Sequence, residues 1–135
     1  MKTSHILISI CKILFPFMFL FGLYVILNGH ISPGGGFQGG AILATSILIT
    51  YFIGYQKIED LNLLIKIEKI TFIIIILIAS ISLITKGQIF TNFFPVDSIA
   101  DKKKIFLILL NFFIGVKVAS GLITLFSTFI EEGKE

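Results

Sequence analysis

The sequence has no arginine and no tryptophan, a single cysteine, Cys11, and two histidines, His5 and His30. One cysteine cannot close a disulfide within the chain, and these three residues fall short of the ligand set of a structural zinc site or an iron–sulfur cluster. Charged residues are only 14% of the chain, whereas soluble proteins average about 25%. The net charge of +3 forms no extended basic patch. We therefore expect no metal, no cofactor and no nucleic-acid partner, and no catalysis by this chain alone.

Long apolar segments occupy most of the chain, which is 56% hydrophobic and has a mean hydropathy of +1.01. Roughly 20 apolar residues cross a bilayer as a helix, which satisfies its own backbone groups in lipid. The third segment is extended back to Lys66, because lysine amines near a helix end can reach the interface. The sequence predicts an all-α integral membrane protein, a single domain over residues 1–135. Its predicted transmembrane helices span about residues 6–27, 37–55, 66–85 and 105–130.

A glycine-rich run, HISPGGGFQGGAILA (residues 30–44), separates the first two apolar segments. Ser32 followed by Pro33 resembles a helix N-cap with proline at the first helical position. A helix beginning there has glycines four residues apart on one face, and such faces let helices approach closely in lipid. The alternative is an unwound backbone that contacts an ion directly. The residues that we assign to helix packing in this run are Pro33, Gly34, Gly35, Gly36, Gly39 and Gly40.

Two polar side chains in or beside the glycine run are candidates for an ion path. Gln38 is the one amide within the run, and it can both donate and accept a hydrogen bond. His30, just before the run, is a residue type that titrates near neutral pH. The alternative for His30 is a solvated side chain at the membrane interface.

Lys117 lies midway along the fourth apolar segment, where a charge costs roughly 2.5–3.5 kcal/mol on insertion scales. Its side chain should therefore face protein or water rather than lipid. Small or polar residues accompany it on one helical stripe, namely Ser120, Gly121 and Thr124. Gly115 belongs to a neighbouring close-packing face, and Gly121 is also assigned to helix packing.

The apolar segments contain no acidic residue near their centres, and Glu68 falls at the edge of the third. We therefore expect a carboxylate partner of Lys117 to come from another subunit or from a second copy of this chain. Three roles stay open for Lys117: a residue of a proton or cation path, an interface lysine paired with a neighbouring subunit, and a side chain that reaches a water-filled crevice. Asn111 lies off the Lys117 stripe and is expected to form an interhelical hydrogen bond.

Two stretches of this chain resemble a known family. The run GHISPGGGFQGGAILA closely resembles the signature of the MnhB/MrpB subunit of Mrp-type Na+/H+ antiporters, and NFFIGVKVASGLITLF resembles the family's fourth-helix pattern. The resemblance covers essentially the whole chain, as one MnhB/MrpB-like domain. Homologous subunits occur in membrane-bound hydrogenase and sulfur reductase complexes. The segment HISPGGGFQGG and Lys117 resemble that branch somewhat more closely than they resemble the stand-alone antiporters.

The resemblance implies an accessory membrane subunit of a multisubunit cation/proton (Na+/H+) antiporter module, which helps to assemble the module and to line its ion path. A first alternative is a same-family subunit of a hydrogenase or sulfur reductase complex that couples ferredoxin oxidation to ion pumping. A further alternative is a small homo-oligomeric transporter, which we disfavour because such transporters depend on an intramembrane carboxylate.

The resemblance also implies the surroundings of the chain. The expected partners are large antiporter-like membrane subunits, other small Mrp-type subunits and the lipid bilayer. In the redox-driven alternative, hydrogenase-like iron–sulfur subunits join them. The expected location is the plasma membrane of a prokaryote, which the chain crosses several times.

Overall fold

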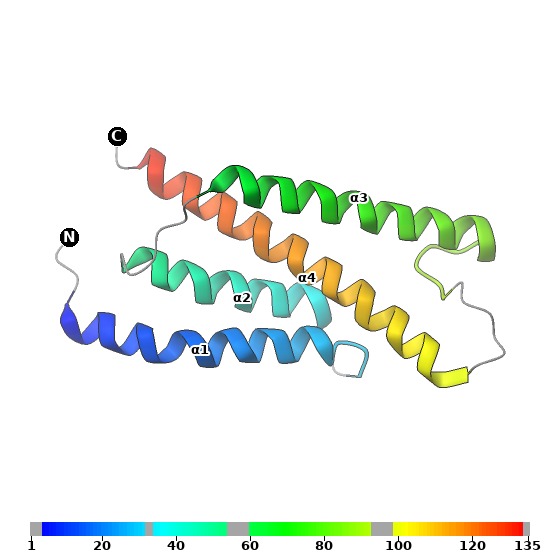
Figure 1. Cartoon of the computed structure of the whole chain (residues 1–135), viewed down its shortest axis with the longest axis horizontal. Helices are drawn as coiled ribbons and strands as arrows, with labels where there is room; N and C mark the ends of the chain where they lie inside the picture. The colour runs from blue at the N-terminus through cyan, green and yellow to red at the C-terminus, as the bar shows by residue number, and fades with distance from the viewer. Residues whose placement is uncertain (1–3, 32–33, 54–59, 93–98, 134–135) are drawn as a thin grey trace.

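The computed structural model of the chain describes residues 4–31, 34–53, 60–92 and 99–133. This described part forms four helices, α1 (His5–Leu27), α2 (Gly35–Phe52), α3 (Leu61–Lys86) and α4 (Ile99–Glu132), which are arranged as Figure 1 shows. All four are long and apolar enough to cross a bilayer. The predicted all-α fold with four transmembrane helices is therefore confirmed.

Helix α3 begins at Leu61, earlier than the predicted start at residue 66. Asp60 is its N-cap, and the Asp60 side chain accepts a hydrogen bond of 3.1 Å from the backbone N–H of Leu63. At the other end Gly87, with φ of 70°, closes the helix by donating its N–H to the carbonyl of Leu83 at 2.8 Å. Side-chain capping at one end and a left-handed glycine at the other set the length of α3.

Helix α2 begins at Gly35 rather than at the predicted Pro33, and its N-cap is Gly34. Gly34 has φ of 113°, which glycine adopts without the steric cost that a side chain brings. Ser32 and Pro33, which were predicted to cap the helix, lie outside the described residues. The glycines thus supply the backbone turn that the sequence analysis assigned to a serine–proline cap.

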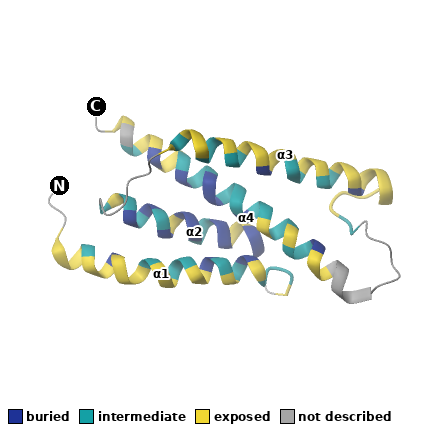
Figure 2. Cartoon of the chain, viewed as in Figure 1, coloured by how far each residue is buried: buried dark blue, intermediate teal, exposed yellow. Residues whose placement is uncertain are grey.

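The helices form an inner pair and an outer pair. Half of α2 is buried within the chain, against 11% of the most apolar stretches of α1 and α3, and Figure 2 shows the same contrast. Helix α2 packs against both α1 and α4, and α4 lies between α2 and α3 (Figure 1). The outer faces of α1 and α3 therefore remain for lipid or for other subunits.

Glycines bring α2 into backbone contact with α4. A Cβ added to Gly40 would lie 2.6 Å from the carbonyl oxygen of Gly115, and one added to Gly36 would overlap the carbonyl oxygen of Asn111. No side chain fits at either position without separating the helices. Gly36 and Gly40 thus act as a small-residue face of the kind that promotes close helix packing in membranes.

A second glycine contact joins α2 to α1. A Cβ on Gly39 would lie 2.8 Å from the carbonyl oxygen of Gly22 and would overlap the side chain of Ile26. Two small clusters of buried apolar side chains fill the space beyond these contacts. Their members are Ile26, Leu43 and Ala119 in one, and Ala44, Leu48 and Ile123 in the other.

Asn111 of α4 fixes the end of α2 by a hydrogen bond. The Asn111 Oδ1 accepts the backbone N–H of Gly36 at 3.0 Å. The first N–H groups of a helix have no partner within that helix, so a side chain of α4 supplies one here. The interhelical hydrogen bond predicted for Asn111 is confirmed.

Replacing Gly40 with leucine is expected to force α2 away from α4, because the new side chain overlaps the backbone of Gly115. Overpacking of this kind costs about 1–3 kcal/mol or more. The loss should be seen as a lower free energy of unfolding when purified protein is unfolded in mixed SDS micelles and followed by circular dichroism. The control is Thr45→Leu, because Thr45 is an exposed residue of the same helix. Equal stability of the two variants would contradict the close-packing account.

Candidate functional site

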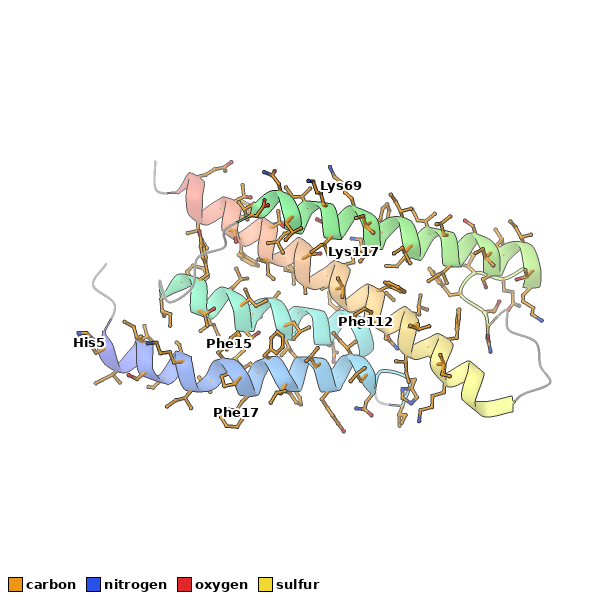
Figure 3. All side chains as sticks on the ribbon, in the orientation of Figure 1. His5, Phe15, Phe17, Lys69, Phe112 and Lys117 are labelled. Carbon is orange, nitrogen blue, oxygen red and sulfur yellow. The ribbon has the colours of Figure 1, made fainter. Side chains whose placement is uncertain are left out.

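Lys117 faces α3 from the middle of α4. It lies at the midpoint of the membrane span Lys104–Ile130, and Figure 3 shows it on the side of α4 next to α3. Its Nζ lies 3.7 Å from Oε1 of Glu68, and the two side chains are 33% and 35% exposed. The same Nζ lies 5.4 Å from the centre of the Phe72 ring, within the range of a cation–π interaction.

The carboxylate beside Lys117 therefore comes from the same chain, and the expectation that another subunit would supply it is wrong. Glu68 lies level with Gly121, one helical turn beyond Lys117 toward the C-terminal end of α4, because a Cβ on Gly121 would lie 3.3 Å from the Glu68 carboxyl carbon. From the sequence alone, Glu68 is predicted at the edge of the third membrane span, close to its start at Lys66. Asp60 could have indicated the deeper position of Glu68. A helix that starts directly after this N-cap residue places Glu68 two turns from its start.

The ion pair makes the charge of Lys117 tolerable at this depth. At an effective dielectric constant of about 20, opposite charges about 4 Å apart attract by about 4 kcal/mol. That attraction is comparable with the roughly 2.5–3.5 kcal/mol cost of one charge at the bilayer centre, and the one-third exposure of both side chains lowers the cost of burying the two charges together. The 3.7 Å separation is longer than a hydrogen bond, so the pair is held by charge rather than by a fixed donor–acceptor geometry.

Two adjoining hollows meet at Glu68. The larger, of about 430 Å³, is an open groove along the last turns of α4, and Glu68 is its one lining residue from α3. The smaller, of about 330 Å³, is lined by Glu68, Lys69, Phe72 and Lys117. We call the larger one the α3–α4 groove, and its lining residues are Glu68, Gly121, Thr124, Leu125, Thr128, Phe129 and Glu132.

The other predicted ion-path residues lie elsewhere. Gln38 is exposed on the first turn of α2, where its side chain folds back over Gly34. His30 follows α1, its Nδ1 lies 3.1 Å from the carbonyl of Leu27, and its Nε2 is buried without a hydrogen-bond partner among the described residues. The structure does not bring His30 and Gln38 together with Lys117, because Lys117 is on the α3-facing side of α4.

The predicted packing glycines divide between two sites. Gly35, with φ of 46°, lies against the Asn111 amide, and Gly115 lies against Ile26 and Gly36. They belong with Gly36, Gly39 and Gly40 to the contacts of α2. Gly121 instead faces Glu68 in the α3–α4 groove. Helix α2 is continuous from Gly35 to Phe52, so its glycines pack rather than present an unwound backbone to an ion.

The two hollows are lined by two carboxylates, two amines and two hydroxyls, which belong to Glu68, Glu132, Lys69, Lys117, Thr124 and Thr128. Over the described ranges, no three His, Cys, Asp or Glu side chains lie together in a way that could hold a metal ion. An ion pair at mid-membrane depth that opens into a groove is suited to binding or relaying a small cation.

Comparison with known proteins assigns the chain to a family. Residues 6–124 match the profile of the domain related to the MnhB subunit of Na+/H+ antiporters. The chain belongs to this MnhB-related family. Its fold also matches a chain in the structure of the membrane-bound sulfane sulfur reductase, an archaeal respiratory membrane complex. That match has a TM-score of 0.72, with 27% identity over 95% of this chain and 58% of the other.

Individual relatives of this MnhB-related chain come from archaea and bacteria. An uncharacterized protein of Methanocaldococcus jannaschii is 30% identical over 79% of this chain and 45% of its own length. A Staphylococcus epidermidis protein named as antiporter subunit mnhB2 is 33% identical over 60% of this chain and 55% of its own length. The corresponding Staphylococcus aureus protein is 34% identical over 62% and 60%. The chain therefore spans about half the length of the relatives it matches.

A charge-swap series tests whether Glu68 and Lys117 depend on each other. Glu68→Lys alone places two amines together and should reduce stability, by less than the roughly 3–5 kcal/mol of a fully buried pair because both side chains are one-third exposed. The double variant Glu68→Lys with Lys117→Glu should recover most of that loss. The measurement is unfolding in mixed SDS micelles, with Lys66→Glu on the exposed side of α3 as the charge control. If the second change restored nothing, the pair would not exist in the folded protein.

Proposed function

We propose that this chain is an accessory membrane subunit of a multisubunit cation/proton antiporter module. The observation that carries the proposal is the match to the MnhB-related family over residues 6–124. The outer faces of α1 and α3 support it, because they leave wide apolar surfaces for other subunits. The large antiporter-like subunits and the other small Mrp-type subunits would be its partners.

Within that module we assign two tasks to two parts of the chain. The glycine contacts of α2 hold the subunit together, so that its outer helices can pack against neighbours. The Glu68–Lys117 pair contributes to the ion path, since paired charges inside a membrane span are characteristic of proton and ion routes. The transported ions would be protons and sodium. The chain would lie in the plasma membrane of a prokaryote.

A specific observation favours a second candidate function. The fold match to a chain of an archaeal sulfane sulfur reductase complex covers almost all of this chain. In such a complex the same subunit would serve an ion-pumping module driven by ferredoxin oxidation, and the redox centres would lie in other subunits. The chain itself would be non-catalytic in both settings.

Purification of the tagged chain from its native membrane in mild detergent, with partners identified by mass spectrometry, tests the accessory role. Recovery of large antiporter subunits without iron–sulfur subunits would support a role in an antiporter. Recovery of iron–sulfur subunits together with them would support a role in the redox-driven complex. Recovery of this chain only as a homo-oligomer would overturn both. That outcome would revive the small transporter, because Glu68 supplies the intramembrane carboxylate that the sequence was thought to lack.

Replacing Lys117 with methionine and Glu68 with glutamine together is expected to abolish coupled transport and to leave the complex assembled. The double change removes both charges, so neither is left unpaired in the membrane. Sodium/proton exchange in membrane vesicles, normalised to the amount of complex, is the readout. Lys117→Arg is the control, because it keeps the positive charge and should retain most activity. Wild-type exchange in the double variant would remove the pair from the mechanism.

A further inference from the structure

The polar groups of the α3–α4 groove are all hydrogen-bond acceptors. Among its lining residues, the carboxylate of Glu68 lies at one end and that of Glu132 at the other, with the hydroxyls of Thr124 and Thr128 between them. The other lining residues are apolar or glycine. An ionised carboxylate can only accept hydrogen bonds. Which kind of species the groove favours therefore depends on where the hydroxyl protons point.

Both threonine protons point away from the groove, into the helix backbone. The Thr124 hydroxyl donates to the carbonyl of Ser120 at 2.9 Å, and the Thr128 hydroxyl donates to the carbonyl of Thr124 at 2.9 Å. A hydroxyl has one proton and two lone pairs. The lone pairs of these two oxygens are therefore left for whatever occupies the groove, and the lining favours a species that donates hydrogen bonds or carries positive charge.

The groove leads from the membrane interior to one end of the bundle. Glu132 is the last residue of α4, and α4 rises about 1.5 Å per residue, so the groove extends about 16 Å from Gly121 to Glu132. Helix α1 begins and helix α4 ends at that end of the bundle, which we call the terminal side (Figure 1). Gly121 keeps the inner end wide, because a Cβ there would lie 3.3 Å from the carboxyl carbon of Glu68.

We propose that the α3–α4 groove is one wall of a path by which a hydrated monovalent cation, sodium or hydronium, reaches Glu68 from the terminal side. The inference rests on the proposed function, since such a path has a use only in a transporting complex. Glu68 is the inner binding station, and Glu132 is the carboxylate at the entrance.

Lys117 competes with the arriving cation for the Glu68 carboxylate. Its Nζ is 3.7 Å from Glu68, too far for a hydrogen bond, and the adjoining hollow lies between Lys117, Phe72 and Lys69. A cation at Glu68 displaces the amine toward this hollow and the Phe72 ring, and the amine returns when the cation leaves. Without the cation the pair is electrically neutral. With the cation bound, the three groups carry one net positive charge, and the Phe72 ring stabilises the displaced amine through a cation–π interaction.

The open side of the groove is covered by protein in the assembled complex. Charged groups within membrane spans face a bundle interior or a water-filled cavity rather than lipid. The remaining wall of the path is therefore a helix of a neighbouring subunit, and the path runs along a subunit boundary.

Cysteine accessibility in the assembled complex tests this path. The one native cysteine, Cys11, is buried and is replaced by alanine. Single cysteines are then placed at Thr124 and Thr128. Membrane vesicles are treated with small methanethiosulfonate reagents, one cationic and one anionic, and each rate is divided by the rate with a free thiol. The cationic reagent should be about ten-fold faster than the anionic one, since a cleft of one charge sign concentrates counter-ions.

The control cysteine replaces Phe126, which is exposed on α4 but does not line the groove. It should remain unlabelled, because it faces lipid or a dry contact. Adding Glu68→Gln to the Thr124 cysteine should bring the ratio of cationic to anionic rates toward one. Absence of labelling at both groove positions, or equal normalised rates for the two reagents, would overturn the proposal.

A comparison of sodium chloride with choline chloride at equal ionic strength tests whether the cation is sodium. Slower labelling of the Thr124 cysteine in sodium assigns sodium to the groove, and equal rates exclude sodium as its cation. Labelling measures the access of the reagents to the groove, and it measures neither transport nor the subunit composition of the complex. Failure of the proposed path is therefore distinguishable from failure of the proposed accessory role. If the complex contained the expected partners but the groove cysteines were not labelled, the path would be rejected and the accessory role would stand.

Discussion

The contact between the backbones of α2 and α4 is the constraint on which the remaining structure depends. Gly36 and Gly40 lie directly against carbonyl oxygens of Asn111 and Gly115. In a bilayer the lipid chains are as apolar as leucine, so helices associate through close packing and hydrogen bonds rather than through the hydrophobic effect. Glycine provides the first of these, and the Asn111 bond to Gly36 provides the second.

This contact also decides which face of α4 remains for chemistry. With one side of α4 occupied by α2, the opposite side, which carries Lys117 and Gly121, turns toward α3. Helix α3 packs mainly against α4 and leaves the groove between them open on one side. Gly115, which packs against α2, and Lys117, which pairs with Glu68, therefore occupy different faces of one helix, so that close packing and the ion pair do not compete for the same positions.

Several features of the site could be predicted because they depend on local pattern. The spacing of glycines predicts a packing face on α2, and the position of Lys117 within an apolar segment predicts that it avoids lipid. The interhelical bond of Asn111 follows from the same reasoning. The Glu68–Lys117 pair was missed, because pairing two residues from different helices requires the vertical offset of those helices. That offset depends on where α3 begins and on how α4 crosses it.

The sequence by itself determined the environment and the number of spans, since apolar length and low charge leave a helix as the structure that satisfies the backbone in lipid. It also determined that the second helix would be the closely packed one. Only the tertiary structure decided which carboxylate meets Lys117 and that Thr124, Thr128 and Glu132 share a groove with it. The physical reason is that Coulomb attraction and groove shape depend on distances of a few ångströms between helices, and helical periodicity within one segment does not specify them.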